Sequence, residues 1–382
     1  MKHAAALALA VSVAMAATMA AACSDDAGNA DDAAPTDAAG DAATDAPPAI
    51  DAPPGTLLAN GTLGPWTAGP PMPVPRGNHA SVILHGDLVV LGGNYRPVPG
   101  GPFVRVDRVD ASTIAADGSL GAWRQIGTLP SPVSEPTAVV WNDTLLVIDG
   151  LHDDLAQDGQ VWAAVRQADG TLGAFTSLGS LPAAREALAS DAYVVGDTLY
   201  VMSGAAPLDG NTLSVLTTTL GAHPLVWHEL LFAPPPSWRE LTMHVFTGQA
   251  FHVLGGDRGT TTPVVDEVSW AKLAGGALTP QPDEAPLPAP TEAGRAVAVD
   301  GYAFLVGGKA QLTGGMAEPG VYVTTIAADG ALGTWTASTP LPAGRTNHAL
   351  ALGPTHLYQT GGSAGMGGLD TVFYAQVRFP VP

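Results

Sequence analysis

The feature that most constrains this chain is a pattern that repeats along it from about residue 57 to the end. A turn followed by Gly and an aromatic residue returns at a mean spacing of about 54 residues. Repetition at a fixed period predicts that the chain stacks copies of one unit of secondary structure. The landmark falls at positions 66, 123, 175, 227, about 280 and 335.

A second landmark is a short apolar run that ends in two small residues. Such a run, bounded by turn residues, suits a strand that is buried on both faces. The composition agrees, because 46 Gly and 34 Pro with only 13% charged residues favour many short strands over long helices. The six runs span residues 87–93, 144–150, 198–204, 250–256, 302–308 and 356–362.

A third landmark is an arginine near the start of the repeat. Arg76, Arg239 and Arg345 each lie 16 positions before the first residue of the small pair. Together the landmarks predict four strands per unit. The first follows the Arg, the second ends in the small pair, the third is β-branched, and an Asp-Gly or Asn-Gly turn leads into the fourth. The aromatic residues, such as Trp123, are expected to pack between sheets.

The diglycine after the second strand, the R-x-x-H-A start at Arg76 and Arg345, and the spaced Trp residues resemble the kelch-repeat family over residues 57–382. The resemblance implies an all-β, six-bladed β-propeller with four-stranded antiparallel blades. The period also agrees better with the ~50 residues of kelch blades than with the ~40–45 of WD40 blades. The chain departs from the pattern in two of the six small pairs and in the weak aromatic position near residue 280.

The chain after Trp335 is long enough for only three strands. Residues 56–66, which precede the first full repeat, form a spare fourth strand. We therefore expect this N-terminal strand to pair with the C-terminal blade around Phe373 and close the ring, since closure removes an open sheet edge.

The N-terminal region predicts export and anchoring. Residues 1–22 have the positive start, apolar stretch and small-residue end of a secretory signal. Cys23 follows three Ala residues and resembles the lipidated cysteine of bacterial lipoproteins; the alternative is ordinary cleavage beside an incidental Cys. Residues 23–54 are rich in Asp, Ala and Pro and predict a disordered linker, which leaves residues 55–382 for the propeller. We expect a lipid-anchored protein of the cell envelope, at the outer membrane or cell surface, whose only membrane contact is its anchor.

The candidate ligand-binding residues lie in the loops before the first strands. In kelch propellers that this chain resembles, these loops and those after the second strands form the binding face. Arginine in such a loop suits bidentate recognition of a carboxylate; the alternative is that each Arg braces its own loop. In blade 5, Thr291 takes the Arg position and Arg295 follows it. The candidates are Arg76, Arg185, Arg239 and Arg345, with Glu135 and Glu186 beside them.

Other motifs carry little chemistry. His79 and His348 occupy one repeat position and are expected to be hydrogen-bonded core residues, and residues 152–154 are expected to form a solvated acidic loop. Zinc-protease, serine-hydrolase and phosphate-loop motifs are absent. A copper radical oxidase of the galactose-oxidase type requires a Tyr–Cys crosslink, which the single Cys23 cannot supply. We therefore predict no metal site and no cofactor.

Two functions remain after these exclusions. The first is a binding or scaffolding module that presents its loop face to a protein or glycan ligand. The alternative is a metal-independent propeller enzyme, such as a sugar epimerase or mutarotase, for which Glu135, Glu186 and Arg345 are nominal acid–base candidates. The net charge of −20 disfavours nucleic acid as a partner. Two or more ionisable groups converging at the axis would favour the enzyme.

Overall fold

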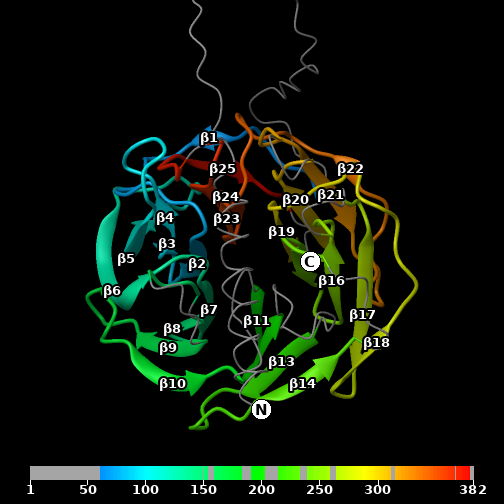
Figure 1. Ribbon diagram of the computed structural model, residues 1–382, viewed down its shortest axis with the longest axis horizontal. Coiled ribbons are helices and arrows are strands. Elements are labelled where there is room, and N and C mark those ends of the chain that lie inside the picture. Colours follow the sequence, from blue (N-terminus) through cyan, green and yellow to red (C-terminus); the bar gives the residue numbers. More distant parts are fainter. Residues whose placement is uncertain are drawn as a thin grey trace, which may run out of the picture.

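The protein is a closed ring of six antiparallel sheets (Figure 1). The computed structural model describes residues 61–148, 150–153, 159–182, 191–202, 214–232, 239–258, 264–310, 315–365 and 367–378. All the regular elements in these ranges are β-strands, and none of the residues described forms a helix that could cross a membrane. The predicted all-β, six-bladed propeller is confirmed. The predicted signal, linker and lipidated Cys23 lie outside the described residues.

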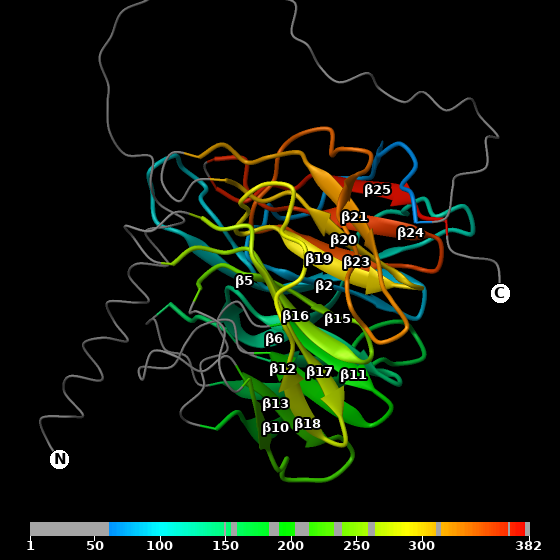
Figure 2. The ribbon, with the colours of Figure 1, turned by 90° about the vertical axis from the view of Figure 1, so that its right-hand side faces the viewer.

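Each blade runs outward from the axis of the ring, as Figures 1 and 2 show. The innermost strands are β2 (Ala80–Leu84), β7 (Thr137–Trp141), β11 (Asp191–Val195), β15 (Met243–Phe246), β19 (Arg295–Val299) and β23 (Ala349–Leu352). The second strands are β3 (Asp87–Leu91), β8 (Thr144–Ile148), β12 (Thr198–Met202), β16 (Ala250–Leu254), β20 (Tyr302–Val306) and β24 (His356–Thr360). The third strands are β5 (Val104–Thr113), β9 (Gln160–Val165), β13 (Ser214–Thr219), β17 (Val268–Ala274), β21 (Val321–Thr325) and β25 (Val372–Gln376). The outer strands are β6 (Arg124–Val133), β10 (Thr176–Ser180), β14 (His228–Leu231), β18 (Ala277–Pro280), β22 (Thr336–Ala337) and β1 (Thr67–Ala68).

The second strand of every blade coincides with one of the six apolar runs of the sequence. Each of β3, β16 and β24 is buried along its whole length, as expected for a strand with sheets packed on both faces. Blade 1 differs slightly from the prediction, because the two-residue strand β4 (Asn94–Tyr95) also pairs with β5.

The N-terminal strand closes the ring as predicted. Strand β1 pairs with β25, the third strand of the last blade, in the register Thr67↔Tyr374 and Ala68↔Phe373. The Trp66 indole donates a hydrogen bond of 3.0 Å to the carbonyl oxygen of Thr339, in the connection between blades 5 and 6. The two ends of the propeller are therefore joined within one sheet, and that sheet is also tied to its neighbour.

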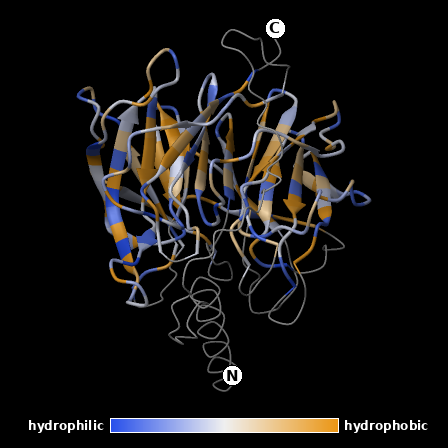
Figure 3. Cartoon of the chain, turned by 90° about the horizontal axis from the view of Figure 1, so that it is seen from above, coloured by the Kyte–Doolittle hydropathy of each residue, from blue (hydrophilic) through white to orange (hydrophobic). Residues whose placement is uncertain are grey.

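The hydrophobic core is divided into six clusters, one between each pair of adjacent blades. The cluster between blades 6 and 1, for example, combines Leu88 and Val90 with Tyr358 and Val372, and Trp123 packs against it. Figure 3 shows hydrophobic residues along the strands and more hydrophilic ones in the connecting loops. Each blade thus depends on both neighbours for burial, as in other repeat proteins.

The diglycine after the second strand joins neighbouring blades through their backbones. A Cβ added to Gly361 of blade 6 would lie 2.3 Å from the carbonyl oxygen of Arg76 in blade 1. The next residue, Gly362, donates its N–H to that same oxygen at 2.8 Å. The equivalent bond runs from Gly308 to the carbonyl oxygen of Arg345 at 2.7 Å. Glycine is required because only a residue without Cβ allows this approach.

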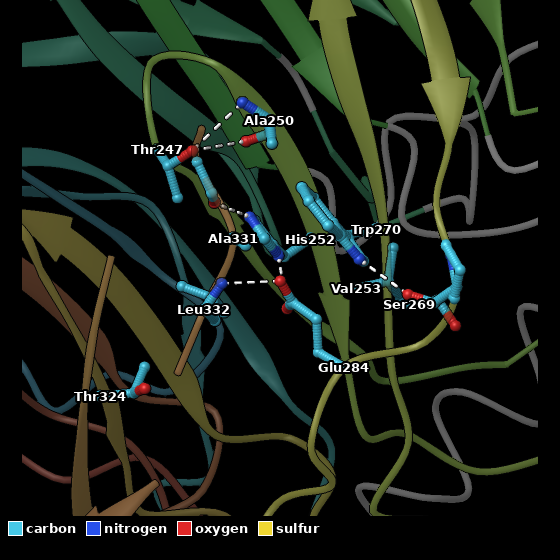
Figure 4. A network of polar contacts seen from close by, with 12 residues as sticks. Thr247, Ala250, His252, Val253, Ser269, Trp270, Glu284, Thr324, Ala331 and Leu332 are labelled. Atoms are coloured by element: carbon cyan, nitrogen blue, oxygen red, sulfur yellow. Dashed lines mark hydrogen bonds and ion pairs between the residues drawn. The ribbon is translucent and has the colours of Figure 1, made fainter. Parts of the chain in front are cut away.

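The turn before each outer strand docks on the preceding blade. In Figure 4, His252 of strand β16 contacts the turn of blade 5, with its Nε2 3.0 Å from the carbonyl oxygen of Gly330. The other ring nitrogen lies 3.0 Å from Glu284, whose second oxygen accepts the backbone N–H of Leu332 at 2.6 Å. Trp270 stacks on the imidazole with an interplanar angle of 4°. This buried polar network fixes blade 5 to blade 4.

Candidate functional site

The recurrent arginines brace their own loops. Arg76 is fully buried, donates to the carbonyl oxygens of Gly92 at 3.1 Å and Arg108 at 3.0 Å, and is paired with the buried Asp110. Burial, opposed by the Asp110 charge, lowers the Arg76 pKa to about 10. These contacts are those of the bracing alternative.

Arg239 and Arg345 have contacts of the same kind. Arg239 donates to the carbonyl oxygens of Gly255 at 3.0 Å and Glu267 at 2.9 Å. Arg345 donates to the carbonyl oxygen of Gly344 at 2.8 Å and to the Thr371 hydroxyl at 3.0 Å. The remaining two candidates of these loops, Arg185 and Glu186, lie outside the described residues.

The two repeated histidines are buried beside the diglycines. His79 Nε2 lies 2.8 Å from the Thr360 hydroxyl of the neighbouring blade. Burial, reinforced by the charges of Arg295 and Arg345, lowers the pKa of His348 to about 3. Burial likewise lowers the pKa of His79 well below its usual value, with further lowering by the charges of Arg76 and Arg295. Both imidazoles are therefore neutral at physiological pH.

Two of the innermost strands, β11 and β19, are half-buried along most of their length. Every residue of β19 is half-buried, whereas β20, the next strand outward, is buried except at its first residue. Strand β11 shows the same half-buried pattern over its first four residues. Side chains that stand at the loop end of these inner strands are therefore positioned to meet a ligand.

Arg295 is the first residue of β19 and lies at this end of the axis. Its Nε donates a hydrogen bond of 3.0 Å to the carbonyl oxygen of His348 in blade 6. Its positive charge affects titratable groups of four other blades: His79, Glu135, Asp191 and His348. Because its charge affects the pKa of groups in four other blades, the Arg295 guanidinium lies close to the axis of the propeller.

An acid lies at the matching position of blade 3. Asp191 opens β11 as Arg295 opens β19, and the Asp191 carboxylate is 2.8 Å from Nδ1 of His244 in blade 4. Burial alone would raise the pKa of Asp191, but the hydrogen bond and charge of His244, with the charge of Arg295, lower it. The other nitrogen of His244 is 3.0 Å from the Thr242 hydroxyl. This carboxylate is therefore ionised and already has a partner.

Glu135 belongs to a set of residues that encircle the same end of the axis. It has a φ of 60°, in the left-handed region, and its side chain is half-buried. Burial raises its pKa, while the charges of Arg295 and Arg105 oppose the increase. Residues in the same position of four other blades share this conformation: Asn78, Leu241, Ala293 and Asn347.

Backbone hydrogen bonds connect these residues from blade to blade. Asn78 donates to Asn347 at 2.8 Å, and Asn347 donates to Ala293 at 3.0 Å. Glu135 donates to Asn78 at 2.7 Å, and Ala293 donates to Leu241 at 3.0 Å. We call this set, Asn78, Glu135, Leu241, Ala293 and Asn347, the axial collar. Strained backbone held by such bonds is common at binding sites.

A buried acidic pair lies further from the axis, between blades 4 and 5. Glu292 is fully buried, and its carboxyl group lies 3.4 Å from the Lys309 ammonium. Burial and a hydrogen bond with Asp257 raise the pKa of Glu292 to about 8. In the same way, burial and the charge of Asp257 raise the pKa of Glu240 to about 6. Asp257 and Glu292 are buried and Glu240 is half-buried, and the raised pKa of Glu292 favours its protonated form at neutral pH.

The remaining sequence candidates do not assemble into a metal site. In the loop of blade 2, Asp153 pairs with Arg105 at 2.8 Å and His152 lies 3.3 Å from the Ser131 hydroxyl, while Asp154 is outside the described residues. Within the described ranges, no group of three or more His, Cys, Asp or Glu side chains is arranged to hold a metal ion.

Asp191, His244 and Arg295 were not among the predicted site residues. The repeat contains a signal for Asp191 and Arg295. The first residue of the inner strand is charged in blades 3 and 5 alone. The corresponding residues in the other blades are Ala80, Thr137, Met243 and Ala349. Of the predicted candidates, Glu135 is one whose pKa the charge of Arg295 acts to lower.

Comparison with known proteins supports the fold. No family model matches the chain, and no curated protein matches it. Among solved structures, "Structure of YjhT" aligns with a TM-score of 0.60 and 14% sequence identity, covering 80% of this chain and 96% of that chain. At this identity the likeness concerns the fold alone. The chain is thus a six-bladed β-propeller similar to a kelch-like propeller, and its membership of the kelch-repeat family stays a prediction.

Proposed function

We propose that this protein is a binding module of the cell envelope that receives a protein or glycan ligand at the collar end of its axis. The observation behind the proposal is that Arg295 has N–H donors that no group of the described residues accepts. Its Nε is engaged, but within the described residues neither Nη nitrogen takes part in a hydrogen bond or ion pair. A half-buried guanidinium in this condition is a common feature of sites that bind polar ligands.

The surroundings of Arg295 support binding by several blades at once. Glu135 adds a half-buried carboxyl group from the collar, and the Asp191 carboxylate lies on the other side of blade 4. Polar groups that converge at one end of the axis can fix the orientation of one ligand. The predicted export signal and lipid anchor would place this site at the cell surface or in the envelope.

The test is direct binding of the purified full chain to glycan and peptide arrays. We expect hits that are lost in Arg295→Gln and kept in the matched control Lys272→Gln. Lys272, like Arg295, is a half-buried cation; it lies on the third strand of blade 4 and its partner is Asp329. Hits that both variants retain would place the ligand elsewhere and contradict the proposal.

The alternative enzyme has one observation in its favour. Glu135 is half-buried with a raised pKa, as expected of a general acid or base. Against it, His244 is buried with both nitrogens engaged, and Arg345 is bonded to Gly344 and Thr371. Incubation of the full chain with free reducing sugars, followed by NMR, separates the two functions. Faster interconversion of sugar epimers or anomers that disappears in Glu135→Gln would favour the enzyme.

A further inference from the structure

We infer that Arg295 anchors a carboxylate group at the end of the ligand. This inference rests on the proposed function and names the chemistry that the site recognises. A terminal carboxylate can come from an acidic sugar or from the end of a peptide, and the structure carries the shared chemistry of both.

First, Arg295 has no carboxylate partner among the described residues. The acid at the matching position of blade 3 is Asp191, and its carboxylate lies 2.8 Å from Nδ1 of His244. No carboxylate of the described residues lies within ion-pair distance of Arg295. His79 and His348 are neutral, so of these three groups Arg295 is the one that offers a positive charge to an anionic group.

The second step is the geometry of the guanidinium. Its Nε is held by the carbonyl oxygen of His348 at 3.0 Å, which fixes the plane of the group. The two Nη nitrogens then remain as parallel donors. A carboxylate has two oxygens with the matching spacing and can accept both hydrogen bonds at once.

The third step is the entrance. The axial collar is built from backbone that neighbouring blades hold together, with bonds of 2.7–3.0 Å from Glu135 to Asn78, Asn78 to Asn347, and Asn347 to Ala293. An entrance of fixed backbone favours a ligand that enters by its end. Burial raises the pKa of Glu135 on this collar, which favours its neutral form and so reduces its repulsion of an anion.

The fourth step is the contrast with the bracing arginines. Arg76, Arg239 and Arg345 use their terminal nitrogens on carbonyl, hydroxyl or carboxylate groups of the protein itself. Arg295 uses only Nε in this way among the described contacts. Of these four arginines, all among the described residues, Arg295 is the one whose Nη pair has no partner in the protein.

The experiment measures binding of two acids and their neutral counterparts by saturation-transfer NMR and calorimetry. The probes are glucuronate with glucose, and acetyl-Gly-Gly with its C-terminal amide. We expect at least one acid to bind the full chain at least tenfold more tightly than its neutral counterpart. Arg295→Gln should remove this preference, Arg295→Lys should restore part of it, and Lys272→Gln should leave it unchanged.

The outcomes are distinguishable. Preference for glucuronate assigns the carboxylate to a sugar, and preference for acetyl-Gly-Gly assigns it to a peptide. If both acids bind no better than their neutral counterparts, the inference is wrong, although array hits that depend on Arg295 would still support the proposed function. A purely structural role for Arg295 would lower the melting temperature of Arg295→Gln while the preference for the acid persisted. If Arg295→Gln fails to fold, the same preference is measured on the unaltered chain and on Arg295→Lys. Equal binding of acid and neutral probe by the unaltered chain, or an undiminished preference in Arg295→Lys, would contradict the inference.

Discussion

The arginines that recur in the loops and the single arginine on an inner strand lie at the same end of the propeller and do different things. Arg76 and Arg239 are buried and bonded to backbone carbonyls of their own blades. Arg295 occurs at its position in one blade only, is half-buried, and within the described residues uses only Nε on the protein itself. In a repeat protein, a residue recurs because the blades that carry it need the same contact. A residue that occurs in one blade only does not make this shared bracing contact, so it is available to bind a ligand.

The largest effect is expected from loss of the recurrent fourth strand of blade 6. Deletion of residues 55–70 removes β1 and the Trp66 contact with Thr339, and it leaves β25 as an open edge. Because each core cluster is shared by two blades, we expect the whole ring to melt at a much lower temperature. Differential scanning calorimetry of the deletion chain would test this; an unchanged melting temperature would refute the closure.

Loss of a bracing arginine should come next. Arg76→Met leaves the buried Asp110 with only Arg108, at 2.6 Å, and leaves the carbonyl oxygen of Gly92 without this donor. We expect a loss of about 3–5 kcal/mol in the free energy of unfolding, measured by urea denaturation. The matched variant Arg239→Met, which breaks bonds to carbonyl and hydroxyl groups, should cost about 2 kcal/mol.

The need for glycine in the diglycine can be tested by comparing Gly361 with Gly86, which has no close neighbours. Gly361 and Gly86 both have positive φ, of 54° and 78°. A Cβ on Gly361 would meet the Arg76 carbonyl oxygen at 2.3 Å, whereas nothing lies within 4 Å of a Cβ on Gly86. We expect Gly361→Ala to cost roughly 3 kcal/mol and Gly86→Ala about 1 kcal/mol, since only the first forces blades apart. Equal costs in urea denaturation would show that the backbone conformation, and not the contact, requires glycine.

These contacts explain why the fold could be predicted from the sequence. The six apolar runs became the six second strands, and the spare segment before the first repeat paired beside Phe373, because period and strand burial are local properties. The role of Arg76 could not be derived in this way, since its partner Asp110 is 34 residues away and only the folded sheet brings them together. The Asp191–His244 bond joins two blades across 53 residues and depends on the ring itself.

Glu292 is enclosed, so its effect should appear in stability. Its pKa of about 8 lies above its usual value of about 4.5, because of burial and the hydrogen bond with Asp257. The folded state therefore holds a proton that the unfolded chain releases, and stability should fall as the pH rises from about 4.5 to 8. Glu292→Gln should remove this slope and increase the free energy of unfolding at pH 8 by about 1–3 kcal/mol. Parallel pH curves for the two chains would contradict the assignment.

The smallest effect on stability is expected at Arg295, and it separates the two kinds of arginine most clearly. Arg295→Gln loses one hydrogen bond, to the carbonyl oxygen of His348, at a half-buried position. The expected cost is about 1 kcal/mol or less in urea denaturation, well below that of Arg76→Met. Removal of its charge should also raise the pKa of His348, which NMR titration of the imidazole can follow. A cost as large as that of Arg76→Met would mean that Arg295 is one more brace, because a ring that needs this side chain in order to fold could not leave its donors to a ligand.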